Sequence, residues 1–250
     1  MTVAAQKRGA PQRRSALLAA IAAKNAEGLI AVIPDIKCIS PKEGNLLSGR
    51  NPVEVARQLV SYGAPILSVV TEGVHFGGST SLLADIVHAV PVPVLRKDFI
   101  TTSEQLEETK SLGAQAVLLI CAMLDEHRLQ TLYALALELG LEPLVEVCAL
   151  DEMKLAKDLG ARLIGINNKN IASLEKDEGG PTRTAELAPH APKGAVVISE
   201  SGIHTPADAR IAALAGAHAV LVGTALWRAP NMQTLFDGLV IERGGSSCGQ

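Results

Sequence analysis

Short apolar runs alternate with longer polar stretches along most of this chain. The runs are apolar at every position rather than at every second one, which is typical of parallel strands covered on both faces. Eight such runs predict strands over residues 29–36, 66–71, 92–95, 116–120, 143–147, 163–167, 195–199 and 219–222.

The stretches between the runs carry signals for the beginning and the end of helices. Asn51, Thr102 and Thr205 each precede a segment of helical character, as N-cap residues do, and a proline follows two of them at the first helical position. Glycines stand where a helix must end before the next strand, at Gly63, Gly113, Gly140, Gly160 and Gly216. This alternation predicts a parallel sheet with right-handed crossovers.

The number of strands favours closure into a single (β/α)8 barrel, and 250 residues is an ordinary length for that fold. An open, doubly wound sheet is the alternative, but it would normally carry a glycine-rich turn after the first strand. Here the turn at 38–41 reads Cys-Ile-Ser-Pro. We therefore expect an N-terminal extension over residues 1–28, a barrel over 29–240 and a flexible tail over 241–250.

The N-terminal extension superficially resembles a secretory signal. Basic residues between positions 7 and 14 precede an apolar run over residues 16–23. The run is short and rich in alanine, and it leads within a few residues into the first predicted strand. We interpret it as a short helix that closes the floor of the barrel.

Composition narrows the possible function classes. A net charge of −3 gives no basic excess for a nucleic-acid backbone, and aromatic residues at 2% offer few platforms for base stacking. No apolar run approaches the roughly 20 residues that span a bilayer. The four cysteines form no CxxC motif, which predicts free thiols in a reducing compartment and hence a cytoplasmic protein. We expect no nucleic-acid partner, no membrane partner and no metal.

Polar residues follow almost every predicted strand, at the end where a barrel carries its chemistry. Period-two alternation puts Asp35 and Lys37 on the inner side of the first strand, where a structural ion pair is the alternative interpretation. Lys97 lies in a charged run after the third strand, and a solvated surface is its alternative. Glu146 stands between two valines, where a carboxylate is costly unless it is paired or functional. Lys97 and Glu146 could meet across the mouth and divide acid and base roles.

The last three strands end in residues that suit polar and anionic groups. Asn167, Asn168 and Asn170 could each orient a polar substrate group, and a simple turn is the alternative, more so for Asn168 and Asn170. Small residues after the seventh and eighth strands leave backbone N–H groups free to approach a phosphate, with simple loop glycines as the alternative. These small residues are Ser201, Gly202, Gly223 and Thr224. His75, after the second strand, has no second histidine at metal-binding spacing and predicts a loop or lid.

Together these strand-end motifs resemble the indole-3-glycerol-phosphate synthase family of tryptophan biosynthesis. The resemblance covers roughly residues 29–231, in the family's order. Its motifs are Asp35-Ile36-Lys37 with Ser40-Pro41, Phe76-Gly77-Gly78-Ser79, and the segments 93–99, 144–147, 165–168, 199–203 and 221–226. It implies a (β/α)8 barrel that needs no cofactor or metal. The implied reaction closes the indole ring of 1-(2-carboxyphenylamino)-1-deoxyribulose 5-phosphate and releases carbon dioxide and water.

The resemblance also implies catalytic roles. Lys97 would be the general acid for ring closure, and Glu146 would transfer protons during dehydration. Lys37 would assist as a charged donor, with Asp35 beside it among the acid–base groups. Asn167 would hold polar groups of the intermediate.

The implied binding residues lie around this set. Phe99 would form apolar wall for the aromatic ring, and Lys169 would stand where the aromatic carboxylate binds. Glu200 would be among the substrate-binding residues. The residues at the phosphate or its approach would be Ser40, Ser201, Gly202, Gly223 and Thr224. The expected partner is a small phosphorylated substrate, and the expected assembly is a monomer or a weak homo-oligomer.

Two departures from the family pattern fall near the acid–base and carboxylate groups, while the phosphate end matches. The family has glutamate at Asp35, whose side chain is one methylene shorter, and arginine at Lys169, which cannot make arginine's bidentate contact. The sequence leaves open an ordinary synthase, a paralogous lyase or isomerase on a related phosphorylated substrate in specialised metabolism, and a non-catalytic barrel that binds a phosphorylated metabolite. Retention of Lys37, Lys97 and Glu146 argues against the last.

Overall fold

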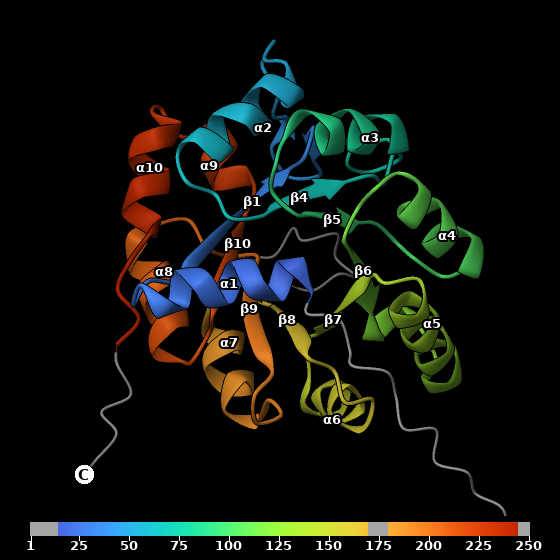
Figure 1. The fold of residues 1–250 in the computed structure, drawn as a ribbon. Helices are drawn as coiled ribbons and strands as arrows, with labels where there is room; N and C mark the ends of the chain where they lie inside the picture. Colours follow the sequence, from blue (N-terminus) through green and yellow to red (C-terminus); the bar gives the residue numbers. More distant parts are fainter. Residues whose placement is uncertain (1–14, 170–179, 245–250) are drawn as a thin grey trace, which may run out of the picture.

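The computed structural model describes residues 15–169 and 180–244 and contains a closed barrel of parallel strands (Figure 1). Each strand pairs with its neighbours in sequence, and the last strand pairs with the first. The predicted (β/α)8 barrel is therefore confirmed, and the open sheet is excluded. The barrel strands are β1 (Ala31–Ile36), β4 (Leu67–Val70), β5 (Val94–Lys97), β6 (Ala116–Ile120), β7 (Glu142–Val147), β8 (Leu163–Asn167), β9 (Val196–Glu200) and β10 (Ala219–Val222).

Helices connect the strands and cover the outside of the barrel (Figure 1). They are α1 (Ala16–Ala26), α2 (Pro52–Ser61), α3 (Thr80–Ala89), α4 (Ser103–Ser111), α5 (Glu126–Glu138), α6 (Leu150–Asp158), α7 (Thr182–Leu187), α8 (Pro206–Leu214), α9 (Thr224–Arg228) and α10 (Met232–Leu239). Short 3-10 turns lie at Cys121–Met123 and Ala188–His190. Strands β2 (Ile39–Ser40) and β3 (Gly44–Asn45) form a small antiparallel hairpin after β1.

The predicted helix signals are confirmed. The side chains of Asn51, Thr102 and Thr205 accept hydrogen bonds from backbone N–H groups in the first turns of α2, α4 and α8. The five glycines predicted to end helices have positive φ angles between +68° and +102°. Glycine adopts this conformation without the steric cost of a Cβ atom, so each helix ends sharply before the next strand.

Two strands extend further at their carboxyl ends than their apolar runs predicted. Strand β5 runs to Lys97 rather than residue 95, and β9 runs to Glu200 rather than residue 199. The first prediction stopped at Leu95, before the charged residue Arg96, and the second stopped at the polar residue Ser199. The carboxyl end of a barrel strand can carry such residues because its inner side faces the open mouth.

The lower part of the barrel interior is an apolar core. Every second strand residue points inward, and near the amino ends of the strands these residues are apolar, as with Ala31, Ile33 and Leu95. Leu17 and Ile21 of α1 are fully buried in the same cluster. Helix α1 therefore lies across the barrel where the strands begin (Figure 1). Residues 1–14 of the predicted extension and residues 245–250 of the predicted tail lie outside the described residues.

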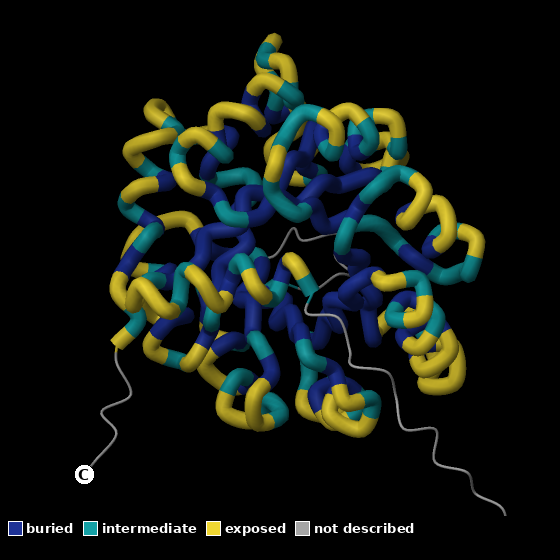
Figure 2. Tube along the Cα trace, in the orientation of Figure 1, coloured by how far each residue is buried: buried dark blue, intermediate teal, exposed yellow. Residues whose placement is uncertain are grey.

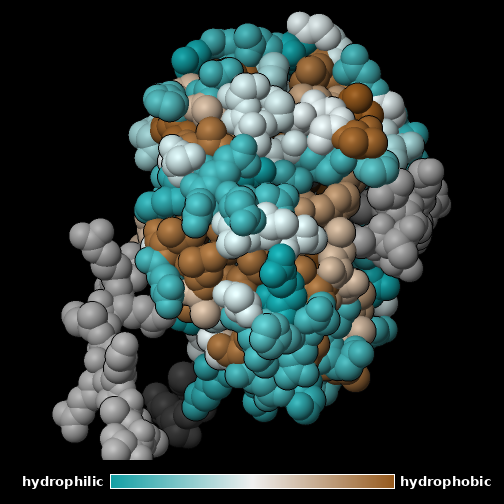
Figure 3. Space-filling view, turned by 90° about the vertical axis from the view of Figure 1, so that its right-hand side faces the viewer, coloured by the Kyte–Doolittle hydropathy of each residue, from teal (hydrophilic) through white to brown (hydrophobic). Residues whose placement is uncertain are grey.

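The alternate strand residues point outward and pack against the helices. One apolar cluster joins β1, β4 and β10 to their helices, and a second joins β6, β7 and β8 to theirs. Figure 2 shows the result as a buried barrel wall inside helices whose outer sides are exposed. On the side seen in Figure 3, hydrophobic residues lie in separate groups with hydrophilic residues between them. Among the described helices, none combines the length and the apolar character needed to cross a membrane.

Candidate active site

At the carboxyl ends of the strands, the inward positions change from apolar to polar. The inward series of β5 is Leu95 then Lys97, and that of β7 is Leu144 then Glu146. The same alternation continues on the other strands. The polar residues at this upper level are Asp35, Lys37, Ser68, Lys97, Glu146, Asn167 and Glu200. Residues far apart in the sequence are thus brought to one mouth.

Lys97 links two carboxyl groups at this level. Its Nζ lies 3.2 Å from Oε2 of Glu146 and 3.2 Å from Oε2 of Glu200. The side-chain amide of Asn167 donates to the other oxygen of Glu146 at 3.1 Å. Glu146 and Asn167 are only 2% and 1% exposed, so these bonds hold the carboxylate in one place beside the ammonium. An ammonium and a carboxylate fixed in this way can exchange protons with a bound substrate.

Glu200 lies beneath this pair and is completely buried. Gly165 leaves room for it, because a Cβ atom at position 165 would stand 1.9 Å from Oε1 of Glu200. Burial raises the pKa of Glu200 to about 8; Lys97 opposes this rise, and Glu146 adds to it. Burial thus favours the protonated form of Glu200, while the adjacent ammonium of Lys97 favours the charged form.

Asp35 is held from within the barrel wall. The hydroxyl of Ser68 donates to Oδ1 of Asp35 at 2.6 Å, and both residues are buried. The indole N–H of Trp227 donates to the backbone carbonyl of Asp35 at 2.9 Å. The shorter carboxylate of aspartate thus has a buried partner, and the strand end that carries it is tied to α9.

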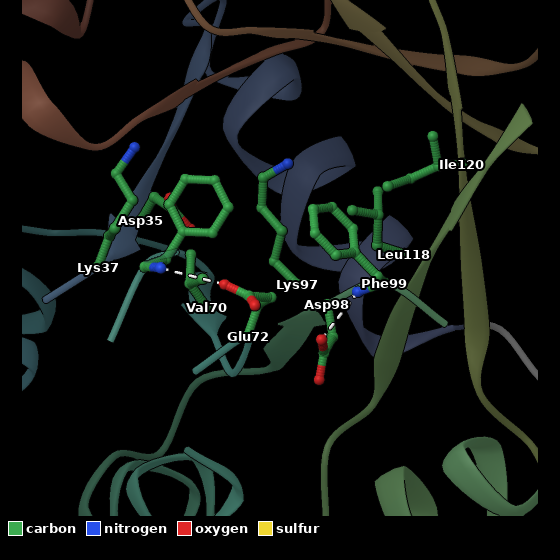
Figure 4. A pocket seen from close by; sticks show the side chains of 10 residues that line it. Asp35, Lys37, Val70, Glu72, Lys97, Asp98, Phe99, Leu118 and Ile120 are labelled. Atoms are coloured by element: carbon green, nitrogen blue, oxygen red, sulfur yellow. Dashed lines mark hydrogen bonds between the residues drawn. The ribbon is translucent and has the colours of Figure 1, made fainter. Parts of the chain in front are cut away.

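A hollow opens beside Lys97 and has an apolar wall (Figure 4). The rings of Phe76 and Phe99 lie with their centroids 6.4 Å apart, and Leu118 lines the hollow as well. The Nζ of Lys37 lies 5.5 Å from the centroid of the Phe76 ring. An aromatic group bound here would meet apolar contacts and nearby cations.

A loop organised by Glu72 carries Phe76. The carboxylate accepts hydrogen bonds from the N–H groups of Val74, His75 and Phe76 at 2.9, 2.7 and 3.1 Å. Partial burial would raise the pKa of Glu72, but these hydrogen bonds outweigh it and hold the pKa below its usual range. The imidazole of His75 lies 3.2 Å from the same carboxylate. The loop predicted around His75 is thus a turn held by hydrogen bonds to Glu72. This turn places Phe76 in the apolar wall of the hollow.

A second hollow shares Asp35, Lys37 and Lys97 with the first. Its other side is formed by Lys169, Ser201, Gly202, Gly223 and Thr224. Ser201 and Gly202 have φ angles of +61° and +68°, and a positive φ is uncommon for serine. Successive N–H groups in such a turn can face a common anion. This end of the mouth therefore suits a phosphate.

Two predicted binding residues line neither hollow. The hydroxyl of Ser40 accepts a hydrogen bond from the N–H of Glu43 at 3.3 Å, within the β2–β3 hairpin. Glu200 contacts Lys97 rather than the hollows, because the space above Gly165 holds its side chain below them. Conversely, Phe76 and Leu118 were missed as site residues. The Phe-Gly-Gly-Ser motif could have indicated Phe76, whereas Leu118 resembles any core residue of an apolar strand.

Arg96, next to Lys97 in the sequence, points the other way. Its guanidinium donates to Thr71 Oγ1 at 3.1 Å and Thr109 Oγ1 at 3.0 Å, and it pairs with Asp98 at 3.0 Å and Glu108 at 2.8 Å. Its side chain is only 3% exposed. Arg96 therefore ties β5 to α4 and does not face the mouth.

We expect Arg96→Met to destabilise the fold by about 3 kcal/mol or more, because it leaves Asp98 and Glu108 without their buried cation. Urea unfolding followed by circular dichroism measures this change. Arg57→Met is the matched control, because Arg57 pairs with Glu54 on the exposed face of α2 and should cost at most about 1 kcal/mol. Equal costs for the two variants would contradict the structural role of Arg96.

The thiols of Cys38, Cys121 and Cys148 are free, and Cys248 lies outside the described residues. Burial raises the pKa of Cys121 to about 12 and that of Cys148 to about 11. Both thiols are therefore protonated at neutral pH. A protonated thiol is a poor nucleophile, so neither is suited to nucleophilic catalysis.

Comparison with known proteins agrees with this geometry. A family model described as indole-3-glycerol phosphate synthase matches residues 2–239. The indole-3-glycerol phosphate synthase of Pyrococcus abyssi is 42% identical over 209 residues, which cover 84% of this chain and 90% of the relative. That of Thermococcus kodakarensis is 42% identical over 210 residues, covering 84% and 92%. Indole-3-glycerol phosphate synthase 1 of Streptomyces coelicolor is 41% identical over 220 residues, covering 88% and 80%.

The match extends over nearly the whole chain and almost the full length of the archaeal relatives. It includes the strands that carry Lys97, Glu146 and Asn167 to the mouth. On these grounds the chain belongs to the indole-3-glycerol phosphate synthase family.

Proposed function

We propose that this chain is a carboxy-lyase that closes the indole ring of 1-(2-carboxyphenylamino)-1-deoxyribulose 5-phosphate with loss of carbon dioxide and water. One observation carries the proposal. The hollow with the apolar wall and the hollow beside the turn at Ser201 and Gly202 share Asp35, Lys37 and Lys97. A substrate with an aromatic ring at one end and a phosphate at the other could occupy both hollows. Its reacting carbons would then lie next to these three residues.

The two ends of the substrate fit the two ends of the mouth. The aryl ring would lie against Phe99, Phe76 and Leu118, which form the apolar wall. The phosphate would lie against the turn at Ser201 and Gly202, with the remaining contacts from Gly223 and Thr224. This placement fixes both ends and brings the aryl carbon close to the ketone, which lowers the entropic cost of ring closure.

Ring closure needs a proton donor at the ketone oxygen, because negative charge develops there as the aryl carbon attacks. Lys97 is the group proposed to supply it, since its ammonium faces the hollow and is held between Glu146 and Glu200. Loss of carbon dioxide then restores the aromatic ring. Lys37 would add a second positive charge near the same oxygen.

Dehydration needs one group that protonates the departing hydroxyl and another that accepts a proton. Glu146 is the proposed carboxyl group for these transfers. Asn167 holds one of its oxygens at 3.1 Å and so leaves the other directed at Lys97. Asp35 would be a second carboxyl group for these transfers. Ser68 holds one of its oxygens with a hydrogen bond of 2.6 Å.

Turnover tests the proposal directly. Purified protein incubated with the carboxyphenylamino-deoxyribulose phosphate is expected to produce indole fluorescence with saturation kinetics. Asp35→Glu combined with Lys169→Arg, which restores the family residues, is expected to change kcat/KM by less than about tenfold. A wild-type protein that binds this compound without turnover would contradict the proposal. A gain of about 100-fold or more in the double variant would instead favour a paralogue with a changed substrate.

A further inference from the structure

Asn168 is a buried asparagine immediately after the catalytic strand residue Asn167. Because strand residues alternate, it points away from the mouth and into the space between β8, β9 and α7. It is 7% exposed. The sequence left open a residue that orients a polar substrate group and a simple turn at this position, and neither hollow is lined by Asn168.

The carboxamide of Asn168 makes hydrogen bonds on both sides. Its Nδ2 donates to the carbonyl oxygens of Glu200 at 2.9 Å and Ser201 at 3.1 Å, and lies 3.0 Å from Ser199 Oγ. Its Oδ1 accepts from the N–H of Thr184 at 2.9 Å and from the hydroxyl of Thr184 at 3.0 Å. Carbonyl oxygens can only accept and a backbone N–H can only donate, so these partners fix which way the amide faces.

The two carbonyls held by Asn168 belong to the turn at the anion end of the mouth. In a trans peptide the carbonyl and the following N–H point in opposite directions. When the carbonyls of Glu200 and Ser201 turn towards Asn168, the N–H groups of Ser201 and Gly202 turn to the opposite side. Ser201 and Gly202 line the second hollow, whereas Asn168 lies behind them.

The hydrogen bonds from Asn168 to Glu200 and Ser201 also hold a strained backbone. Ser201 has a φ of +61°, a conformation that serine adopts only where surrounding contacts hold it. The backbone N–H of Asn168 donates to the carbonyl of Glu200 at 2.9 Å, in addition to the side-chain bond. Asn168 therefore holds the chain at the point where Glu200, which contacts Lys97, passes into the turn.

We propose that Asn168 is a positioning residue for substrate binding. It holds the carbonyls of Glu200 and Ser201 and so directs the following N–H groups at the phosphate of the substrate. This inference rests on the proposed function, because it assumes that the second hollow takes a phosphate. It adds a residue that touches no substrate and acts through the direction of two peptide groups.

Asn168→Asp tests whether Asn168 positions the turn at Ser201 and Gly202. The variant keeps the shape of the side chain and the acceptor for Thr184, but it places an oxygen where Nδ2 now faces two carbonyl oxygens. The inhibition constant of inorganic phosphate against turnover, and the KM for substrate, are both expected to rise by about tenfold, with a smaller fall in kcat. The rise in Tm that phosphate causes in the wild-type protein should shrink in parallel.

Thr184→Val is the matched control. It removes the hydroxyl that donates to Asn168 Oδ1, but it leaves the backbone N–H of residue 184 and the bonds of Asn168 to the turn. Its Tm should fall while the phosphate inhibition constant stays unchanged. If Asn168→Asp does not fold, Asn168→Ser replaces it, and its phosphate inhibition constant should also rise.

The outcomes separate this inference from the proposed function. An Asn168 variant with a lower Tm but an unchanged phosphate inhibition constant and KM would show a purely structural residue and overturn the inference, while wild-type turnover would leave the proposed function standing. A wild-type protein with neither turnover nor a response to phosphate would overturn both. An equal rise of the phosphate inhibition constant in Thr184→Val would also count against the inference. A general loss of packing around Asn168 would then explain the effect.

Discussion

Replacing Lys97 with glutamine is expected to slow indole formation by about 10³-fold. Glutamine keeps nearly the length of the side chain but removes the ammonium that lies 3.2 Å from both Glu146 and Glu200. The ketone oxygen would then lose its proton donor at the step where it becomes negatively charged. The apolar wall of Phe76 and Phe99 and the turn at Ser201 and Gly202 remain in place, so kcat should fall and KM should change little.

Lys97→Arg separates charge from proton donation. Arginine restores a cation between the two carboxyl groups, so its Tm should lie closer to that of the wild type than the Tm of Lys97→Gln. Its guanidinium stays protonated and is a poor general acid, so turnover should remain low. Lys154→Gln is the control for loss of a lysine, since Lys154 pairs with Asp158 on the exposed surface of α6, and its kcat should match the wild type. A Lys97→Gln enzyme with more than about a tenth of the wild-type kcat would contradict the acid role.

Much of this cluster could be predicted from alternation within the strands. Lys97 and Glu146 interrupt apolar runs at the end of a barrel where inward side chains meet, and a charge there needs a partner or a function. The structure places the two groups in contact, at 3.2 Å. The sequence therefore indicated a converging pair even though 48 residues separate its members.

Arg96 shows why charge alone does not predict which residues face the mouth of the barrel. Arg96 and Lys97 stand side by side in one charged run, yet one is buried between β5 and α4 and the other faces the mouth. The strand was predicted to end at residue 95, so the alternation was not carried through the charged residues. Extending it from the inward Leu95 separates the two, because Lys97 shares its parity and Arg96 does not.

Apolar and glycine residues of the site carry weaker sequence signals. Leu118 lines the aromatic hollow but looks identical to the leucines that fill the barrel below it. Gly165 faces inward from β8, and its importance depends on a side chain 35 residues later in the sequence. Such relations follow from the register between neighbouring strands, which the apolar pattern of a single strand does not specify.

Gly165→Ala is expected to lower kcat by about 10²-fold, although residue 165 lines neither hollow. The added Cβ would stand 1.9 Å from Oε1 and 3.0 Å from Cδ of Glu200, which is completely buried and must shift within the barrel. Lys97 contacts that carboxyl group at 3.2 Å and would shift with it. Displacement of a reacting group by about 1 Å is enough for a loss of this size. Steady-state kinetics should show the change in kcat with little change in KM.

Crowding of the fold needs its own control. Gly238→Ala in α10 places a Cβ 3.1 Å from Pro206 Cγ, so it crowds two outer helices without touching the mouth. Gly165→Ala should cost about 1–3 kcal/mol of stability in urea unfolding, as overpacking of a core usually does. Gly238→Ala should retain the wild-type kcat. A loss of kcat in both variants would point to general loosening rather than to displacement of Glu200.

The route through Glu200 can be tested by removing its side chain. In a Glu200→Ala background the new methyl group at residue 165 has no carboxyl group to displace, so the effect of Gly165→Ala on kcat should shrink from about 10²-fold to less than about threefold. The stability cost should shrink as well, because the space left by Glu200 accepts the methyl group. An equal loss of kcat in both backgrounds would contradict the mechanism. If the loss of kcat disappears in the Glu200→Ala background, Gly165 on β8 acts on Lys97 on β5 through Glu200 on β9. The small size of Gly165 leaves room for Glu200, and Glu200 in turn fixes the position of the Lys97 ammonium.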